Sequence, residues 1–106
     1  MQSGTKYKSI PEVVDGIRFA SKKEARRYRE LKILEKCGDI AHLETQPRFV
    51  IMIGKDKICT YVADFRYFNS KTQVTVIEDV KGIQTPVYKL KKKLVKALYD
   101  INIIEI

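Results

Sequence analysis

The sequence contains few of the side chains that build zinc centres and nucleophilic active sites. Among its 106 residues there are two cysteines, one histidine and no tryptophan. Cys37 and Cys59 stand apart, with no second cysteine or histidine at metal-binding spacing, so we expect two free thiols in a reducing compartment. A histidine-based zinc site or a Ser-His-Asp triad would depend on His42 alone, which argues against both classes.

Long apolar runs are also absent. The longest uncharged ones, such as residues 49–54, fall far short of the roughly 20 residues that a membrane-spanning helix needs. The opening segment, residues 1–9, is basic and lacks the apolar stretch of a secretory signal. We therefore expect a cytoplasmic protein without a membrane partner, in which residues 1–9 form a flexible basic arm.

The chain is rich in positive charge and has enough apolar residues for a core. Hydrophobic residues make up 44% and charged residues 32%, which indicates a folded chain rather than a disordered one. The length fits one compact domain over residues 1–106, and no internal repeat divides it. The net charge of +8 indicates a polyanionic partner, most often nucleic acid. Charge alone does not distinguish an enzyme from a passive binder.

Turn and cap signals predict an N-terminal hairpin followed by a helix. Apolar residues flank Asp15–Gly16, a pair that tolerates the positive φ angles of a tight hairpin turn. Ser21 then fits an N-cap, with Glu24 three residues later as in a capping box. Gly38 fits the C-terminal stop, so we expect the helix to end just before it.

The rest of the chain alternates strand patterns with turns and one further helix. After a short connector, β-forming residues recur over 48–53, 58–68 and 73–82. Thr85 can cap a second helix with a proline at its first position, and residues 101–106 form a last strand. The order of hairpin, helix, three strands, helix and strand predicts an α/β fold. The second helix should bury four apolar residues: Val87, Leu90, Leu94 and Leu98.

Two of these strand patterns contain isolated charged residues. Glu78, Asp79 and Lys81 interrupt one apolar strand, and Asp64 interrupts the strand before it. Because side chains alternate across a strand, Asp79 and Lys81 share one face while Glu78 points to the other. If the two strands pair through the turn at 69–72, Asp64 can meet Asp79 and Lys81 across neighbouring strands.

Two carboxylates held this close repel each other unless a cation holds them together. Mg²⁺ takes one or two carboxylates together with phosphate oxygens and water, and Mn²⁺ accepts the same oxygen ligands. A lysine beside them can orient or activate a water and stabilise charge that develops on phosphorus. Asp64, Asp79 and Lys81 on a basic protein therefore predict metal-dependent phosphodiester hydrolysis.

The same residues resemble the PD-(D/E)xK signature of restriction-endonuclease-like nucleases, with Asp64 as the first acid and Asp79-Val80-Lys81 as the (D/E)xK element. Ala63 stands where the signature has proline, a departure common in that superfamily. The resemblance covers roughly residues 20–106 and implies an αβββαβ core, with a mixed central sheet flanked by helices. More narrowly, the chain resembles a family of small phage-encoded proteins, related to phage Holliday-junction resolving endonucleases and to the transposon end-cleaving nuclease subunit. This resemblance rests on the segments DGIRFASKKEARRYREL, QPRF, YVADFRYF and EDVKG.

What the resemblance implies is a DNA endonuclease. Its substrate would be duplex or branched DNA, such as a Holliday junction, and its products would carry a 5′-phosphate and a 3′-hydroxyl. Asp64 and Asp79 would hold Mg²⁺, and Lys81 would position or deprotonate the attacking water. Glu24 matches a glutamate on the first core helix that often adds to the metal site. For a phage-encoded protein the location would be the host-cell cytoplasm.

Basic residues on both predicted helices suit a surface that tracks DNA phosphates, with an affinity that falls steeply with salt. A solvated helix face is the alternative. By the resemblance, Gln46 would contact a backbone phosphate or a water at the site, although an ordinary turn residue fits it equally well. Tyr61, Tyr67 and Tyr88 could stack on bases, but strand alternation favours core packing for the first two. The candidate DNA-binding residues are Arg26, Arg27, Arg29, Lys89, Lys91, Lys92, Lys93 and Lys96.

Each candidate site residue also has a structural alternative. The capping box alone accounts for Glu24 through the helix terminus. Asp64 could pair with an arginine, and Asp79 with Lys81 could form a surface ion pair. Glu78 fits a solvated residue or a partner for a helix better than a catalytic group.

Two other functions fit the same charge: a non-catalytic DNA-binding module, and a nuclease subunit that is active only within a larger complex. A domain this small has one active centre, so cutting both strands or resolving a junction would require a homodimer. The apolar residues 101–106 are the candidate interface.

Overall fold

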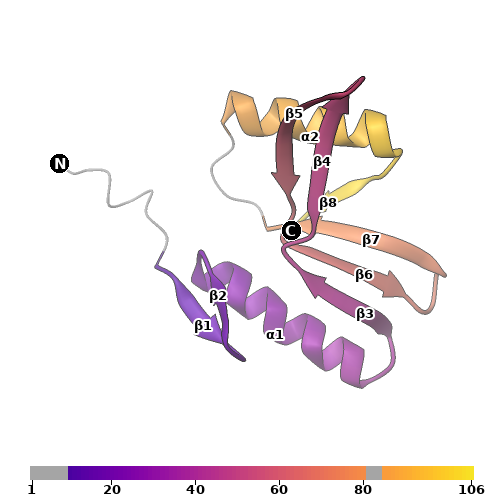
Figure 1. Cartoon of the computed structure of the whole chain (residues 1–106). Coiled ribbons are helices and arrows are strands. Elements are labelled where there is room, and N and C mark those ends of the chain that lie inside the picture. Colours follow the sequence, from indigo (N-terminus) through magenta and orange to yellow (C-terminus); the bar gives the residue numbers. More distant parts are fainter. Residues whose placement is uncertain (1–9, 81–84) are drawn as a thin grey trace.

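The computed structural model describes residues 10–80 and 85–106 (Figure 1). The basic arm expected at 1–9 lies outside the described residues. Within them, no helix is long and apolar enough to cross a bilayer. The described elements, in chain order, are β1 (Glu12–Val14), β2 (Ile17–Phe19), α1 (Lys22–Lys36), β3 (Ile40–Thr45), β4 (Arg48–Ile53), β5 (Asp56–Val62), β6 (Phe65–Asn69), β7 (Val74–Asp79), α2 (Pro86–Tyr99) and β8 (Ile103–Glu105).

The centre of the fold is a four-stranded mixed sheet in the order β3-β6-β7-β8. β6 pairs antiparallel with β3 and with β7, whereas β8 pairs parallel with β7. α2 makes the crossover that a parallel pair requires. β4 and β5 pair with each other in a separate ribbon. When this ribbon and the N-terminal hairpin are set aside, the order is helix, three strands, helix, strand, so the predicted α/β fold with a mixed sheet is confirmed.

The sheet has a core on each face. Adjacent residues of β7 point to opposite sides, so Val76 packs in one core and Ile77 in the other. The first core lies between α1 and the sheet and contains Phe19, Ala25, Tyr28, Leu31, Ile40, Phe65 and Tyr67. The second joins the sheet to the β4–β5 ribbon and α2 and contains Phe49, Ile51, Tyr61, Ala63, Ile77 and Val95. Core packing of Tyr61 and Tyr67 is thereby confirmed.

The predicted hairpin and first helix are confirmed by their local geometry. Asp15 and Gly16 have φ of 53° and 77° between β1 and β2, as a two-residue hairpin turn requires. The Ser21 Oγ accepts the N–H of Glu24 at 3.1 Å and donates to the Glu24 carboxylate at 3.2 Å. Gly38, with φ of 86°, follows the end of α1.

The strands expected between the helices are placed differently from the prediction. The expected connector contains β3, which is an edge strand of the central sheet. The second expected strand is broken at Ala63 and Asp64 into β5 and β6. The Ala63 N–H donates to the Pro47 carbonyl at 3.1 Å, whereas the Asp64 N–H donates to the Glu78 carbonyl at 3.1 Å. The chain therefore leaves the ribbon and enters the central sheet between these two residues.

Helix α2 begins as predicted but buries a different face. The side chain of Thr85 accepts a backbone N–H of the first turn at 3.1 Å, and a proline follows it. The centre of the buried face is Val95, which is 0% exposed. The expected buried stripe is wrong, because Val87, Leu90 and Leu98 are 61%, 57% and 52% exposed. At 3.6 residues per turn the helix is rotated by roughly 90° from the prediction.

Candidate active site

Asp64 and Asp79 meet where β6 begins and β7 ends. The Asp64 N–H donates to Asp79 Oδ1 at 3.2 Å, and the Val80 N–H donates to Asp64 Oδ2 at 2.6 Å. Each carboxylate thus accepts a backbone N–H from the chain segment that carries the other. The predicted convergence of the two aspartates is confirmed, while their catalytic role stays a prediction.

Glu24 of α1 reaches the same place from the first turn of its helix. Burial is the main cause that raises the pKa of Asp64, followed by the negative charge of Glu24 and a hydrogen bond between the two carboxyl groups. The Val80 N–H acts in the opposite direction, and the pKa of Asp64 is raised to about 7. Glu24 also keeps its contact with Ser21. The capping role and the position beside Asp64 therefore coexist in one side chain.

Asp79 is held from the α2 side by a tyrosine. Its side chain is 4% exposed, and the Tyr88 hydroxyl donates to Asp79 Oδ2 at 2.5 Å. Burial raises the pKa of Asp79, whereas the Tyr88 hydroxyl, the Asp64 N–H and the charge of Lys92 lower it. Burial and this hydrogen bond raise the pKa of Tyr88 in turn. The sequence suggested only base stacking for Tyr88, because nothing in a linear pattern indicates that its hydroxyl reaches β7.

The sequence analysis also did not predict an ion pair between Lys92 and Glu105, next to Asp79. Glu105 of β8 lies opposite Asp79 in the parallel register, and its carboxylate accepts from Lys92 Nζ at 2.7 Å. The same ammonium lies 5.9 Å from the centre of the Tyr88 ring. Lys92 was expected on a DNA-binding face, but it is partly buried and its charge acts within the site.

Glu78 points to the opposite face of β7 and binds α1. Arg27 Nε donates to Glu78 Oε1 at 2.9 Å, and Arg27 Nη2 donates to Glu78 Oε2 at 2.7 Å. The Tyr67 hydroxyl donates to the same carboxylate, and Arg27 Nη1 also binds Glu30 at 3.1 Å. Burial and Glu78 raise the pKa of Tyr67 to about 12. Glu78 is therefore the partner of a helix, one of the two alternatives that the sequence left open, and Arg27 is engaged in the fold.

The other predicted site residues do not all lie at the site. Lys81 lies outside the described residues. Gln46 adjoins the site through its backbone, since its N–H donates to the Asp64 carbonyl at 2.9 Å, while its side-chain amide donates to the Arg18 carbonyl at 3.2 Å. Five of the candidate basic residues are exposed, and one of them, Arg29, pairs with Glu12. The five are Arg26, Arg29, Lys89, Lys93 and Lys96.

The donor set suits a hard divalent cation. The three carboxylates come from α1, from the link between β5 and β6, and from β7. Glu24 lies within hydrogen-bonding reach of Asp64 although both are acids. A cation relieves such a contact between like charges. Within residues 10–80 and 85–106, no group of three or more acidic, histidine or cysteine side chains is already arranged to hold a metal ion. Mg²⁺ fits this arrangement better than zinc does, because it keeps several waters and takes only one or two carboxylates.

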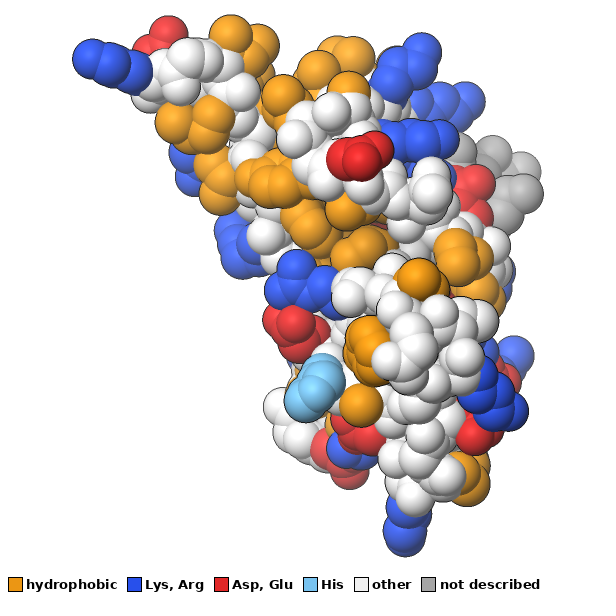
Figure 2. All heavy atoms as spheres, turned by 90° about the vertical axis from the view of Figure 1, so that its right-hand side faces the viewer, with side chains coloured by type: hydrophobic (Ala, Val, Ile, Leu, Met, Phe, Trp, Pro, Cys, Tyr) orange, Lys and Arg blue, Asp and Glu red, His pale blue; other side chains and the backbone are white. Residues whose placement is uncertain are grey.

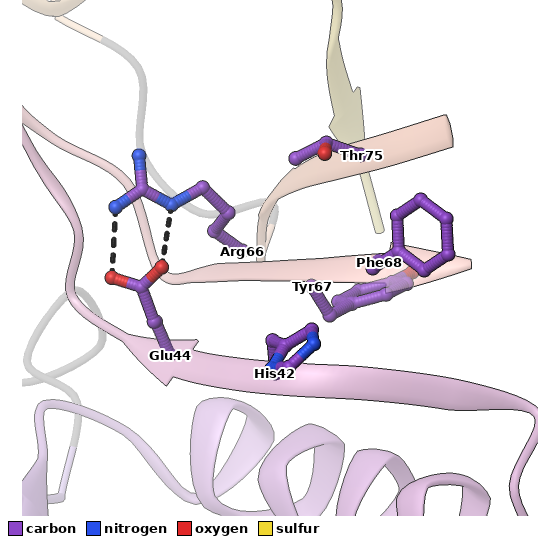
Figure 3. Close-up of a pocket in the computed structure, with 6 residues that line it drawn as sticks. All are labelled: His42, Glu44, Arg66, Tyr67, Phe68 and Thr75. Atoms are coloured by element: carbon purple, nitrogen blue, oxygen red, sulfur yellow. Dashed lines mark hydrogen bonds and ion pairs between the residues drawn. The ribbon is translucent and has the colours of Figure 1, made fainter. Parts of the chain in front are cut away.

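A separate hollow of about 370 Å³ lies over β3, β6 and β7 (Figure 3). Arg66 binds both oxygens of Glu44, with Nε at 2.9 Å from Oε1 and Nη2 at 2.8 Å from Oε2. His42 projects from β3 on the same side (Figure 3). Because the two charged side chains pair with each other, we place the candidate active site at the contact of Asp64 with Asp79 instead.

These observations define a small mixed α/β domain with a half-buried group of carboxylates at the junction of α1, the β5–β6 link and β7. A family model described as a protein of unknown function, DUF1064, matches residues 4–104. The chain belongs to this family. No curated protein and no solved structure matches it.

Proposed function

We propose that this protein is a metal-dependent DNA endonuclease. The observation that carries the proposal is the convergence of Asp64 and Asp79, fifteen residues apart in the chain, with Glu24 beside Asp64. Bringing acids together in a partly buried place opposes folding, because burial and mutual repulsion both disfavour their charged forms. A carboxyl group whose pKa is raised as strongly as that of Asp64 is typical of functional sites.

Asp64, Asp79 and Glu24 are the residues that would hold the ion. When bound, Mg²⁺ or Mn²⁺ would neutralise these acids and polarise a phosphate oxygen. The chain itself orients two of the ligands: Tyr88 and the Asp64 N–H hold Asp79, and the Val80 N–H holds Asp64. Such supporting hydrogen bonds are what keeps a metal ligand in a productive orientation. Positioning or deprotonating the attacking water is the role we expect for Lys81.

The proposed substrate is duplex or branched DNA, a Holliday junction included. The net charge of +8 supports a polyanionic substrate, and Gln46 lies beside the site. We leave Arg27, Arg29 and Lys92 out of the DNA surface, because each is paired with a glutamate. The exposed basic residues that remain as phosphate contacts are Arg26, Lys89, Lys93 and Lys96.

A non-catalytic DNA-binding module is the second candidate. Both oxygens of Asp79 accept a hydrogen bond from the chain, one from Asp64 and one from Tyr88. A carboxylate whose two oxygens both accept hydrogen bonds from the chain can have a purely structural role. Under this alternative the protein binds DNA in a salt-sensitive manner and leaves it intact, either alone or as a subunit of a larger complex.

The test is cleavage of supercoiled plasmid and of a four-way junction, each with Mg²⁺ and with EDTA. Asp79→Asn and Asp64→Asn are the informative variants, because the amide keeps the size of the side chain and an oxygen acceptor. Asp56→Asn is the matched control, since Asp56 is exposed at the start of β5 in the ribbon. DNA binding is measured in parallel by fluorescence anisotropy.

We expect Mg²⁺-dependent cleavage by the wild type and by Asp56→Asn, and none by the two site variants, which still bind DNA. Equal cleavage by the wild type and Asp79→Asn would refute the assignment of the site. Binding without cleavage of either substrate by the wild type would favour the second candidate.

A further inference from the structure

A hollow of about 300 Å³ lies between β5 and the first turns of α2, in the lobe formed by β4, β5 and α2. We call it the α2 pocket. It adjoins the candidate active site through Tyr88, whose hydroxyl binds Asp79 at 2.5 Å and whose ring centre lies 6.0 Å from that of Tyr61. No carboxylate lines it. The lining residues are Thr60, Tyr61, Val62, Thr85, Val87, Tyr88 and Lys91.

Lys91 brings a positive charge to the α2 pocket. It was expected on a DNA-binding face, but its side chain is partly buried and its Nζ donates to the Thr60 carbonyl at 3.4 Å. All thirteen acidic residues of the chain lie within the described residues, and none of them forms an ion pair with Lys91. A partly buried cation is unfavourable without a counter-ion, and the chain itself supplies none here.

The other lysines of α2 need no such anion, because water or an acid compensates their charge. Figure 2 shows Lys and Arg side chains gathered at the upper right of the molecule, at the height at which Figure 1 places α2. Three lysines of the helix are exposed, and Lys92 pairs with Glu105. Lys91 is therefore the lysine of α2 that an anion from outside the chain compensates best. The three exposed lysines are Lys89, Lys93 and Lys96.

The start of α2 adds a hydrogen-bond donor and a partial positive charge. The N–H groups of a first helical turn have no partner within the helix. The side chain of Thr85 accepts that of Tyr88 at 3.1 Å, whereas the N–H of Val87 has no acceptor among the described residues. No acidic residue lies in this first turn, so the positive end of the helix dipole is also uncompensated. Phosphate is an anion that such a helix terminus binds readily.

A buried hydroxyl independently indicates a ligand. Tyr61 lines the α2 pocket and only 2% of its surface is exposed. Within the part of the chain that the structure describes, its hydroxyl has no hydrogen-bond partner. An unpaired polar group in the interior opposes folding, and buried side-chain polar groups are paired as a rule. A phosphate oxygen is an acceptor that this hydroxyl can use.

The size and the lining of the α2 pocket narrow the ligand to a nucleotide. Val62 and Val87 are 43% and 61% exposed, and they offer apolar contact to a sugar or a base, which a bare phosphate ion lacks. A volume of about 300 Å³ is at the lower end of the range for small-molecule sites, as suits a single nucleotide. The net charge of +8 attracts phosphate groups to the protein as a whole.

We propose that the α2 pocket binds one nucleotide through its phosphate. Lys91 and the start of α2 compensate the charge of the phosphate, and the Tyr61 hydroxyl donates to one of its oxygens. The nucleotide belongs either to a DNA strand or to a free nucleoside monophosphate, which share this chemistry. In a strand it is a neighbour of the phosphate at Asp64 and Asp79. The inference concerns binding and does not depend on the proposed cleavage.

The test is binding in EDTA of two probes: a fluorescein-labelled DNA duplex, followed by anisotropy, and thymidine 5′-monophosphate, followed by NMR titration. Tyr61→Phe removes only the unpaired hydroxyl, and Lys91→Gln removes only the charge. Tyr99→Phe and Lys36→Gln are the matched controls, because Tyr99 lies at the far end of α2 and Lys36 is exposed on α1. Urea denaturation measures the stability of every variant.

We expect Tyr61→Phe to weaken binding roughly tenfold without loss of stability, because its hydroxyl has no partner to lose in the unliganded protein. Lys91→Gln should weaken the same probe and, for DNA, reduce the slope of log K against log salt by about one, a slope that Tyr61→Phe leaves unchanged. A loss confined to the duplex assigns the nucleotide to a DNA strand, and a loss confined to the monophosphate assigns it to a free nucleotide. A loss with both probes shows that either source is bound.

Unchanged binding of both probes by Tyr61→Phe would overturn the proposal, and so would an equal loss in Tyr99→Phe or Lys36→Gln. A Tyr61→Phe variant less stable than Tyr99→Phe would show that the hydroxyl has a structural partner, which would overturn it as well. Cleavage plays no part in these assays, so their outcome is independent of the test of the nuclease.

Discussion

The pair formed by Arg27 and Glu78 predicts a large and specific loss of stability when it is broken. Glu78 is 1% exposed and accepts two hydrogen bonds from Arg27 at 2.9 and 2.7 Å. The substitution Arg27→Met keeps an apolar stem of similar length but removes the guanidinium. The carboxylate of Glu78 would then be buried and would keep the hydrogen bond from the Tyr67 hydroxyl.

The size of the loss follows from the burial of the two groups. Removing one member of a buried ion pair costs about 3–5 kcal/mol of unfolding free energy, because the other charge is left uncompensated. The Arg27 side chain is 21% exposed, so water can partly replace it. We therefore expect a loss near the lower end, about 3 kcal/mol. For a domain of this length such a loss lowers Tm by roughly 15 °C.

The measurement is urea denaturation followed by circular dichroism, with Arg29→Met as the control on the same helix. Arg29 pairs with Glu12, but its side chain is 51% exposed, and exposed pairs contribute only about 0–1 kcal/mol. The double variant Arg27→Met with Glu78→Gln should regain part of the loss, because it removes the uncompensated charge. If Arg27→Met loses no more stability than Arg29→Met, the ion pair described here does not hold the fold.

Three further outcomes are expected. Tyr88→Phe removes the hydroxyl that binds Asp79 at 2.5 Å, so cleavage should fall by about tenfold with little change in stability; an unaltered rate would contradict this role. Gly16→Ala should lower the unfolding free energy by about 1 kcal/mol, because φ there is 77°. A variant as stable in urea as the wild type would contradict this backbone conformation of the turn. The Leu43 N–H lowers the pKa of Glu35 in the folded state, so this bond stabilises the protein above the unfolded pKa and is lost as pH falls through the folded one. The stability difference between wild type and Glu35→Gln should therefore shrink between about pH 7 and pH 3, and a constant difference would refute the assignment.

Local chemistry made part of the fold predictable. The Asp15–Gly16 turn and the Ser21 and Thr85 caps depend only on residues that are close to them in the chain. The residue types at these positions therefore predict them. β3 was missed because its sequence lacks a regular apolar alternation and its pairing with β6 shifts register between Ala41 and Glu44. The break at Asp64 was missed because it depends on distant pairing partners.

The rotation of α2 has a specific cause. The sequence pattern placed the leucines of the second helix on its buried side, and Tyr88 among the residues that could stack on bases. In the structure, Tyr88 is partly buried and its hydroxyl binds Asp79, whereas Tyr99 stays 45% exposed although its hydroxyl donates to the Val50 carbonyl at 2.6 Å. A tyrosine whose hydroxyl has a partner can be buried as readily as a leucine. The partners lie on other elements, so the sequence could not reveal them.

The meeting of Asp64 and Asp79 was predictable, because two antiparallel strands joined by a short turn bring their outer ends together. Which face each acid serves follows from alternation along β7, and it was also predicted correctly for Glu78. The support of the site was not predictable. Tyr88 and the pair of Lys92 with Glu105 come from α2 and β8, whose positions depend on how the whole lobe packs.

The two neighbouring acids of β7 explain how the site is held. Glu78 binds Arg27 of α1 on one face of the sheet, and Asp79 binds Tyr88 of α2 on the other. Arg27 lies three residues, close to one helical turn, after Glu24, so the ion pair that fastens α1 to β7 also fixes how closely Glu24 approaches Asp64. A variant that breaks this pair should therefore loosen the contact of Glu24 with Asp64 as well as the fold. Burial of Glu78 is costly unless it is paired, and its role in placing Glu24 gives a reason for a charge in an otherwise apolar strand.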